Sequence, residues 1–164
     1  MKVIDDFLPL YYFKQLQDFM IDSGSLPWYY NSSVVSFDGK IDDQFQFTHT
    51  FWDDRPPWNG TASTYYDNIS FCLQKLGVNK LIRCKANLRS RTIFHRKAGY
   101  HTDFDDVTTA ILYMNTNNGW TEFKKGGKVK SVENRIVIFD SNLMHQGTTC
   151  TDHKTRVVLN FNYV

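Results

Sequence analysis

The sequence predicts a mainly β protein with helices in its N-terminal half, which is an α+β fold. From residue 80 onward, short runs of alternating apolar and polar residues are separated by turn-forming clusters such as Asn117-Asn118-Gly119 and Gly126-Gly127. Before residue 80, two segments repeat their apolar residues at the period of an α-helix. Many short strands preceded by helices predict a sandwich or barrel, with the helices packed on one outer sheet face.

Two helices are expected in the first half of the chain. The first covers residues 9–22, because Pro9 suits a first helical turn and Gly24 suits the position after the end. The second covers residues 64–76, where Thr64 and Asp67 have a spacing like that of a capping box and Gly77 closes the helix. The apolar stripe of the first helix comprises Leu10, Phe13, Leu16, Met20 and Ile21.

Between the helices, residues 28–37 and 44–52 are expected to form strands, with a turn at Asp38-Gly39. Aromatic residues and His49 alternate with polar residues in the second of these segments, so one of its faces is aromatic. We interpret His49 as a packed aromatic side chain rather than a metal ligand. Residues 55–60 form a loop rich in Pro and Gly.

The strand predicted at residues 81–91 has one apolar and one polar face. The polar face either is exposed to solvent or lines a polar cavity. Its members are Arg83, Lys85, Asn87, Arg89 and Arg91. Further strands are expected at residues 100–103, 107–115, 120–123, 128–132, 135–140, 144–147 and 155–163. In the last of them, Arg156, Val158, Asn160 and Asn162 share a face, which suits the inside of a barrel that holds a polar ligand.

The length and charge of the chain restrict the possible functions. With 164 residues it is expected to be a single domain over 1–164, with helical support at about 1–79 and a β core at about 80–164. A net charge of +2 with mixed signs does not favour nucleic acid as a partner. No apolar run reaches the length of a membrane span, and the N-terminus does not resemble a signal peptide. Three widely spaced cysteines indicate reduced thiols and a cytoplasmic location.

His101 and Asp103 form the first half of a possible metal site. On a strand, residues i and i+2 point to the same face, so an imidazole and a carboxylate would point to one place. His145 would add a second imidazole, which gives the 2-His-1-carboxylate set typical of non-haem Fe(II) oxygenases. Taken alone, His-x-Asp also fits a surface loop with a hydrogen-bonded pair.

The motifs that follow His101 strengthen the iron interpretation. Residues 80–164 resemble the 2-oxoglutarate- and Fe(II)-dependent dioxygenase superfamily, and within it the prolyl-4-hydroxylase-like branch. His101-Thr102-Asp103 is similar to its HxD motif, and residues 109–115 resemble its TxxxYLN strand. Residues 119–123 resemble its GGxTxF turn, and residues 134–140 resemble the strand before its distal histidine. His145-Gln146-Gly147 is similar to its HxG motif, and Arg156 stands where the family has its cosubstrate-binding arginine.

The resemblance implies a double-stranded β-helix, the jelly roll of cupin-like proteins, supported by the N-terminal helices. It implies Fe(II) held by His101, Asp103 and His145, with 2-oxoglutarate and O2 as the other reactants. Arg156 and Tyr113 would bind the far carboxylate of 2-oxoglutarate, since a guanidinium matches a carboxylate bidentately. Asn87 is a further candidate for cosubstrate contact. The implied reaction is hydroxylation of a C–H bond, on a prolyl, other peptidyl or amino-acid substrate or on a small metabolite.

The sequence departs from the family pattern at two positions. Trp120 replaces the second glycine of the GG pair, where it either shapes a substrate wall or only packs. Val158 replaces a serine that helps some relatives to bind the carboxylate. His95 and His153 are alternative ligands by sequence position, but His145 follows an apolar strand and precedes Gly147 as the family pattern requires. A non-catalytic jelly-roll module that binds a metal or a sugar-like ligand is the alternative function.

Overall fold

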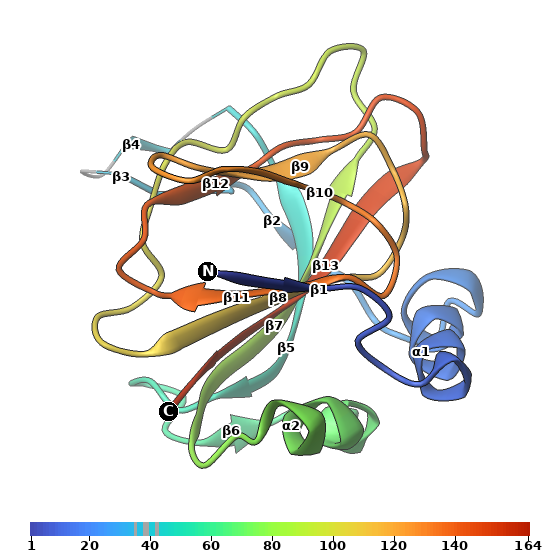
Figure 1. Ribbon diagram of the computed structural model, residues 1–164, viewed down its shortest axis with the longest axis vertical. Coiled ribbons are helices and arrows are strands. Elements are labelled where there is room, and N and C mark those ends of the chain that lie inside the picture. Colours follow the sequence, from blue (N-terminus) through green and yellow to red (C-terminus); the bar gives the residue numbers. More distant parts are fainter. Residues whose placement is uncertain (35, 38–39, 42) are drawn as a thin grey trace.

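Two antiparallel sheets face each other in the computed structural model, which describes residues 1–34, 36–37, 40–41 and 43–164 (Figure 1). The larger sheet has eight strands in the order β1-β11-β8-β13-β7-β5-β2, with β6 paired to β5. The smaller sheet has three strands in the order β10-β9-β12. This arrangement confirms the mainly β, α+β class and the jelly roll that were predicted.

The strands of the larger sheet come from the whole length of the chain. They are β1 (Lys2–Ile4), β2 (Tyr29–Asn31), β5 (Gln46–Asp53), β6 (Thr61–Ala62), β7 (Leu81–Ser90), β8 (Thr108–Tyr113), β11 (Ile136–Asp140) and β13 (Thr155–Tyr163). The smaller sheet contains β9 (Trp120–Phe123), β10 (Gly127–Lys130) and β12 (His145–Gly147). Strands β3 (Ser36–Phe37) and β4 (Lys40–Ile41) pair with each other. The turn expected at Asp38-Gly39 lies outside the described residues.

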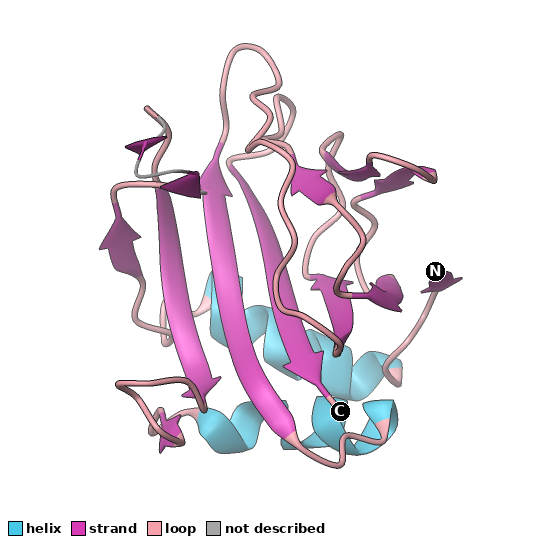
Figure 2. Cartoon of the chain, turned by 90° about the vertical axis from the view of Figure 1, so that its left-hand side faces the viewer, coloured by secondary structure: helices cyan, strands magenta, loops and turns pink. Residues whose placement is uncertain are grey.

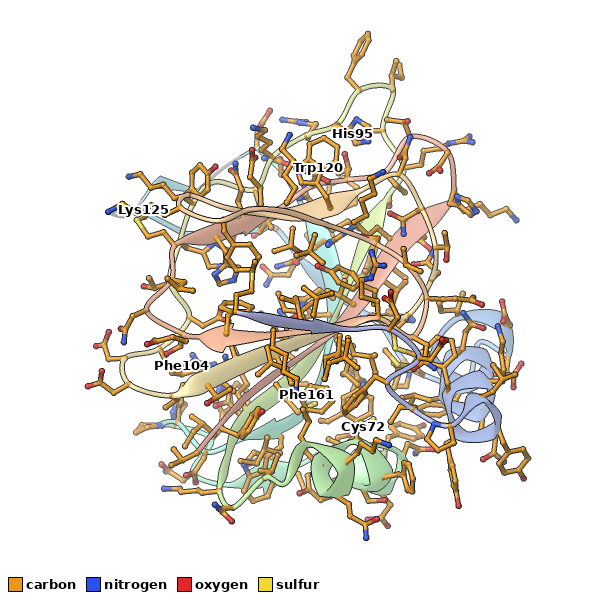
Figure 3. The ribbon with its side chains drawn as sticks, in the orientation of Figure 1. Cys72, His95, Phe104, Trp120, Lys125 and Phe161 are labelled. Atoms are coloured by element: carbon orange, nitrogen blue, oxygen red, sulfur yellow. The ribbon has the colours of Figure 1, made fainter. Side chains whose placement is uncertain are left out.

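The helices cover the face of the larger sheet that points away from the smaller one (Figure 2). Helix α1 (Leu10–Gln17) continues into a π-helical turn, Asp18–Asp22, and helix α2 (Ser70–Leu76) follows a 3-10 turn, Tyr66–Ile69. Phe13 and Cys72 from the helices are buried with Phe161 of β13 (Figure 3). No helix among the described residues is long and apolar enough to span a bilayer.

Two details of the predicted helices are wrong. Leu10 is 67% exposed, and Phe7 and Leu8, which precede helix α1, are buried in the core in its place. The capping role expected of Thr64 and Asp67 is absent. Instead, the Ser63 hydroxyl accepts the Tyr65 N–H at 3.1 Å, so the turn begins one residue before Thr64. Gly77 ends α2 in the left-handed conformation, with φ +66°, as predicted.

Strands β7 and β13 lie side by side at the centre of the larger sheet and pair in register, Arg156 opposite Arg89 and Val158 opposite Asn87. Their apolar faces meet the helices, since Cys84, Ala86, Leu159 and Phe161 are all fully buried there. Their polar faces therefore point into the space between the two sheets. The polar face of residues 81–91 thus lines a cavity along most of its length, rather than facing bulk solvent.

A second apolar cluster closes one side of the space between the sheets. Phe123 of β9 packs edge-on against Phe139 of β11, with ring centroids 4.9 Å apart. The cluster comprises Ile111, Tyr113, Phe123, Val129, Val137, Phe139 and Val158. The smaller sheet is therefore held against the larger one by packing, and the cavity lies next to this packed region.

Candidate active site

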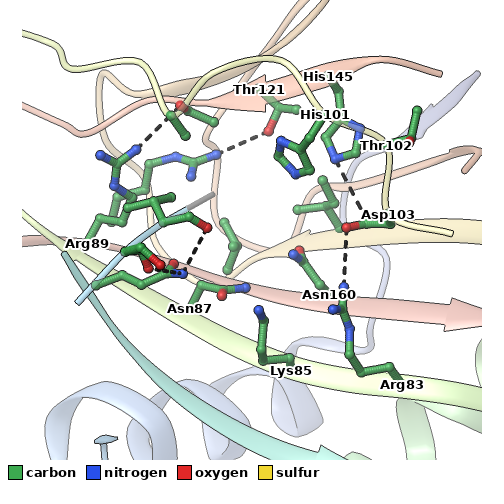
Figure 4. A pocket seen from close by; sticks show the side chains of 18 of the residues that line it. Arg83, Lys85, Asn87, Arg89, His101, Thr102, Asp103, Thr121, His145 and Asn160 are labelled. Atoms are coloured by element: carbon green, nitrogen blue, oxygen red, sulfur yellow. Dashed lines mark hydrogen bonds and ion pairs between the residues drawn. The ribbon is translucent and has the colours of Figure 1, made fainter. Parts of the chain in front are cut away.

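A cavity of about 590 Å³ opens between the two sheets (Figure 4). Strands β7 and β13 supply one wall, and His145, Gly147 and Thr121 of the smaller sheet supply the opposite wall. His101 and Asp103 enter from the loop that connects β7 to β8. The volume of the cavity is within the usual range for a small-molecule site, roughly 300–1,000 Å³.

The structure brings the three predicted metal ligands together in this cavity. The ligand atoms of His101, Asp103 and His145 all lie within 4.8 Å of one another. The backbones of His101 and His145 exchange two hydrogen bonds, with N–O distances of 3.0 and 2.9 Å, and this pairing places the two rings 4.6 Å apart. Residues 100–103 do not form the expected strand, because only His101 makes this isolated bridge.

The position of Asp103 depends on side chains of the larger sheet rather than on strand alternation. Arg83 donates to its Oδ1 at 3.2 Å, and Asn162 donates to its Oδ2 at 3.2 Å. Burial alone would raise the pKa of Asp103, but the charge of Arg83 and the two nearby imidazoles outweigh it and lower this pKa below its ordinary value. The carboxylate is therefore ionised at neutral pH.

Backbone contacts fix which imidazole nitrogen faces the cavity. His101 Nδ1 lies 3.1 Å from the Gly99 carbonyl, and His145 Nδ1 lies 3.0 Å from the Leu143 carbonyl. A carbonyl oxygen only accepts, so each Nδ1 carries the proton and each Nε2 keeps a free lone pair. Burial, and then the neighbouring His145, lower the pKa of His101, which favours the neutral ring that a metal requires.

The donor set fits Fe(II). Two imidazole nitrogens and one carboxylate oxygen lie on one side of the site, and the cavity leaves the other side open for further ligands. Hydrogen bonds from the surroundings orient all three side chains, as is typical of metal sites. The predicted alternatives do not join this group: His95 lies beside Asn118, and His153 is exposed beside Asp152.

Arg156 is buried deeper in the cavity. Its Nε donates to Ser131 Oγ at 2.8 Å and its Nη2 donates to Thr121 Oγ1 at 3.2 Å. Burial lowers its pKa, but a guanidinium remains charged in a protein. The side chain is thus a buried cation whose partners are neutral hydroxyl groups, and one edge of it faces the cavity.

Tyr113 is fully buried next to this arginine and is not among the residues that line the cavity. Its hydroxyl donates to Thr121 Oγ1 at 2.8 Å, and the Arg156 guanidinium lies 5.5 Å from its ring centroid. Because Thr121 Oγ1 accepts from both neighbours, its own proton is free to point into the cavity. Thr121 thus lines the cavity next to Arg156. The sequence did not single it out as a site residue, although it stands in the GGxTxF-like turn.

Asn87 lines the cavity from β7, beside Lys85 on the same strand and near Asn160 of β13. Trp120 is not among the lining residues. Its ring packs near His95, at 4.6 Å between centroids, and under the ammonium group of Lys128, on the outer side of the smaller sheet (Figure 3). The indole therefore packs outside the cavity and does not form a wall of it.

His49 belongs neither to this group nor to the cavity lining, as expected. It is 4% exposed on β5, with its nitrogens 2.9 Å from the Pro27 carbonyl and 2.9 Å from the Ser63 hydroxyl. Its ring packs against Phe51 and Tyr65. It is a packed aromatic side chain, not a ligand.

No family model matches the chain, and no curated protein matches it. Solved structures do resemble it. A prolyl-4-hydroxylase from Pseudomonas putida is 14% identical with a TM-score of 0.65, over 99% of this chain and 91% of that one. A 2OG-Fe(II) oxygenase family oxidoreductase from Burkholderia pseudomallei is 12% identical with a TM-score of 0.62, over 94% of this chain and 77% of that one.

A third neighbour is a prolyl hydroxylase from Trichoplax adhaerens, solved in complex with a hypoxia inducible factor peptide fragment. It is 13% identical with a TM-score of 0.59, over 99% of this chain and 82% of that one. The resemblance found in the sequence is thus confirmed at the level of the fold. The chain has the jelly-roll fold of the 2OG-Fe(II) oxygenases and prolyl-4-hydroxylases, and it carries the HxD and distal histidine residues together in one cavity.

Proposed function

We propose that the chain is a 2-oxoglutarate- and Fe(II)-dependent dioxygenase that hydroxylates a C–H bond of its substrate. The observation that supports this most strongly is the placement of a three-ligand metal set and a buried arginine in the same cavity. A metal-binding jelly roll without catalysis needs the three ligands. It does not need a buried guanidinium that has only neutral hydroxyl partners in the described residues.

In this proposal His101, Asp103 and His145 hold Fe(II). When bound, Fe(II) supplies the oxidative chemistry that couples decarboxylation of 2-oxoglutarate, to succinate and CO2, to hydroxylation with O2. Arg156 and the Thr121 hydroxyl bind the far carboxylate of 2-oxoglutarate through charge-assisted hydrogen bonds. Tyr113 orients Thr121 by donating to its oxygen. Asn87 supplies an amide to the middle of the cavity.

The proposed substrate is a peptidyl or amino-acid side chain or a small metabolite. The structural neighbours include prolyl hydroxylases, which supports this class. Nucleic acid is a less favoured substrate, because the net charge of the chain is only +2.

An anaerobic titration tests the reaction class. Purified protein is mixed with Fe(II) and 2-oxoglutarate, and the weak visible charge-transfer band of an iron-chelated keto acid is recorded. We expect the band in the wild-type protein and not in His101→Ala or Asp103→Ala. His153→Ala is the matched control, because it removes an exposed imidazole outside the cavity, and it should keep the band.

A folded protein that binds Fe(II) but never develops the band would contradict the proposal and favour the binding-module alternative. Succinate release under air distinguishes the two functions independently. An oxygenase releases succinate from 2-oxoglutarate, whereas a binding module does not.

A further inference from the structure

The described residues that line the cavity carry more positive than negative charge. Their only carboxylate is Asp103. Their cationic side chains are Arg55, Arg83, Lys85, Arg89 and Arg156. Such an excess attracts anions into the cavity.

Most of these cationic side chains form an ion pair or a hydrogen bond within the protein. Arg83 pairs with Asp103 at 3.2 Å, and Arg55 pairs with Asp53 at 2.6 Å. Arg89 donates to Gln44 and to the Gly147 carbonyl. Lys85 differs, because its ammonium group makes no hydrogen bond or ion pair within the part of the chain that the structure describes.

Lys85 projects from the middle of β7 into the cavity (Figure 4). Burial, and then the charge of Arg83, lower the pKa of Lys85 to about 8. The group therefore remains mostly protonated at pH 7. A charged ammonium that is largely withdrawn from water is costly without an anionic partner.

Two amide side chains flank this ammonium group. Asn160 is opposite Lys85 in the register between β7 and β13, and its Oδ1 is buried without a hydrogen-bond partner in the described structure. Asn87 is two residues along β7 and also lines the cavity. Buried polar atoms normally have hydrogen-bond partners. Lys85, Asn87 and Asn160 therefore form a group that suits the binding of a polar ligand.

The cosubstrate does not account for the charge of Lys85. This step rests on the proposed function. The charges of a divalent metal ion and Arg156 are balanced by Asp103 and the two carboxylates of 2-oxoglutarate. Arg83, Lys85 and Arg89 then remain as positive charges on the cavity wall, because Arg55 is paired with Asp53. Arg83 donates to the Asp103 carboxylate, and Arg89 donates to Gln44 and to the Gly147 carbonyl, whereas the Lys85 ammonium group makes no such contact among the described residues.

We propose that Lys85, with Asn87 and Asn160, binds a carboxylate of the primary substrate, which is a small carboxylic acid with a hydrogen-bond donor, such as an amino acid. The ammonium group pairs with the carboxylate, and the Asn160 amide oxygen accepts from the N–H or O–H of the same molecule. An internal prolyl residue of a peptide carries neither a free carboxylate nor a backbone donor, so it fits this subsite poorly.

Acetate is the probe that tests the subsite, with acetamide as its uncharged counterpart. The protein is loaded with Mn(II), which is paramagnetic and accepts nitrogen and oxygen ligands, and with saturating 2-oxoglutarate. Metal-induced relaxation of the acetate methyl protons then reports acetate bound near the metal. We expect acetate to bind about tenfold more weakly, or worse, to Lys85→Met than to wild type.

Three controls define the comparison. Lys85→Arg keeps the charge and should restore much of the acetate binding. Lys75→Met removes an exposed lysine on α2, far from the cavity, and should not change it. Acetamide should show little difference between wild type and Lys85→Met, and thermal unfolding checks that each variant is folded.

Equal acetate affinities for wild type and folded Lys85→Met would overturn the proposal. Acetate binding that depends on Lys85 only when 2-oxoglutarate is omitted would also overturn it, because Lys85 would then bind the cosubstrate. Failure of the proposed function itself has a different signature: Mn(II) or 2-oxoglutarate would not bind to the wild-type protein at all.

Discussion

At the scale of single residues, Arg156 allows the sharpest test of the cosubstrate site. It is 4% exposed and contacts only neutral groups among the described residues. Arg156→Met removes a buried charge, so the fold should tolerate it. Its affinity for 2-oxoglutarate should fall by about 10- to 100-fold, since a hydrogen bond to a charged group contributes roughly 1.5–3 kcal/mol. Titration of the anaerobic visible band measures this change.

Arg91→Met is the matched control, because Arg91 directly follows β7, the strand that pairs with the Arg156 strand β13, but is exposed. It should leave the 2-oxoglutarate titration unchanged. An unchanged titration for Arg156→Met would exclude this arginine from the cosubstrate site.

Gly119 allows a second residue-scale prediction. A Cβ at this position would lie 2.7 Å from Arg156 Cδ and 3.0 Å from the Thr149 carbonyl oxygen. The carbonyl belongs to the backbone and cannot move aside easily, so Gly119→Ala should displace the Arg156 side chain. We expect weaker 2-oxoglutarate binding with unchanged metal affinity, measured by separate titrations of each.

Gly77→Ala controls for a general loss of stability. Its φ of +66° makes alanine strained, but a Cβ there has no neighbour within 4 Å. It should lower the free energy of unfolding by about 1 kcal/mol without changing 2-oxoglutarate binding. If both glycine variants weaken binding equally, the steric explanation for Gly119 is wrong.

At the scale of elements, the sequence predicts strands better than it predicts loops. The alternation in β7 and β13 gave the correct faces, because a strand with one face on a core must alternate. The loop from residue 91 to residue 107 has no such constraint. There, Asp103 is positioned by Arg83 and Asn162, which are distant in sequence, and alternation could not reveal these contacts.

The same limit applies to the candidate site: residues in sequence motifs could be predicted, and contacts made by packing could not. The HxD and HxG motifs identified the triad, and strand alternation put Lys85 and Asn160 on polar faces that suit a cavity. Only the structure showed that these two side chains and Thr121 line the same cavity. For Tyr113, the motif match suggested direct contact with the carboxylate. In the structure its hydroxyl donates to Thr121 Oγ1, and Thr121 is among the residues that line the cavity whereas Tyr113 is not. Which side chain of such a pair faces a ligand depends on packing between the two sheets, and packing is not encoded in a local pattern.

His49 on strand β5 should make the stability of the protein depend on pH. Burial lowers the pKa of His49 below its ordinary 6.5. Below about pH 6.5 the unfolded chain therefore binds more protons than the folded one, and stability falls as the pH decreases. His49→Phe keeps an aromatic ring but cannot be protonated. It should be less stable at pH 7.5, because two hydrogen bonds are lost, and should lose less stability between pH 7.5 and 5.5.

Urea unfolding of the metal-free protein at both pH values measures this difference. The pKa of His101 is lowered in the same direction, so the variant should keep part of the slope. Identical slopes for the variant and the wild type would show that His49 does not contribute to the pH dependence.

At the scale of the whole molecule, the metal site connects the two sheets. His145 belongs to β12 of the smaller sheet, whereas Asp103 is hydrogen-bonded to Arg83 and Asn162 of the larger sheet. A bound metal ion would therefore bridge the sheets directly, in addition to the apolar cluster around Phe123 and Phe139. Binding at this site should stabilise the packing of one sheet on the other, and not only the loop that carries His101.

Metal-dependent stability tests this bridging role. With Mn(II) at a hundredfold excess over its Kd, the free energy of unfolding should rise by about 2.7 kcal/mol, and a chelator should reverse the gain. Asp103→Ala should abolish it, and Asp105→Ala, an exposed neighbour in the same loop, should keep it. Hydrogen exchange should slow in β12 as well as in the loop, because both are held by the same ion. Slower exchange in the loop alone would mean that the metal orders the loop without joining the sheets.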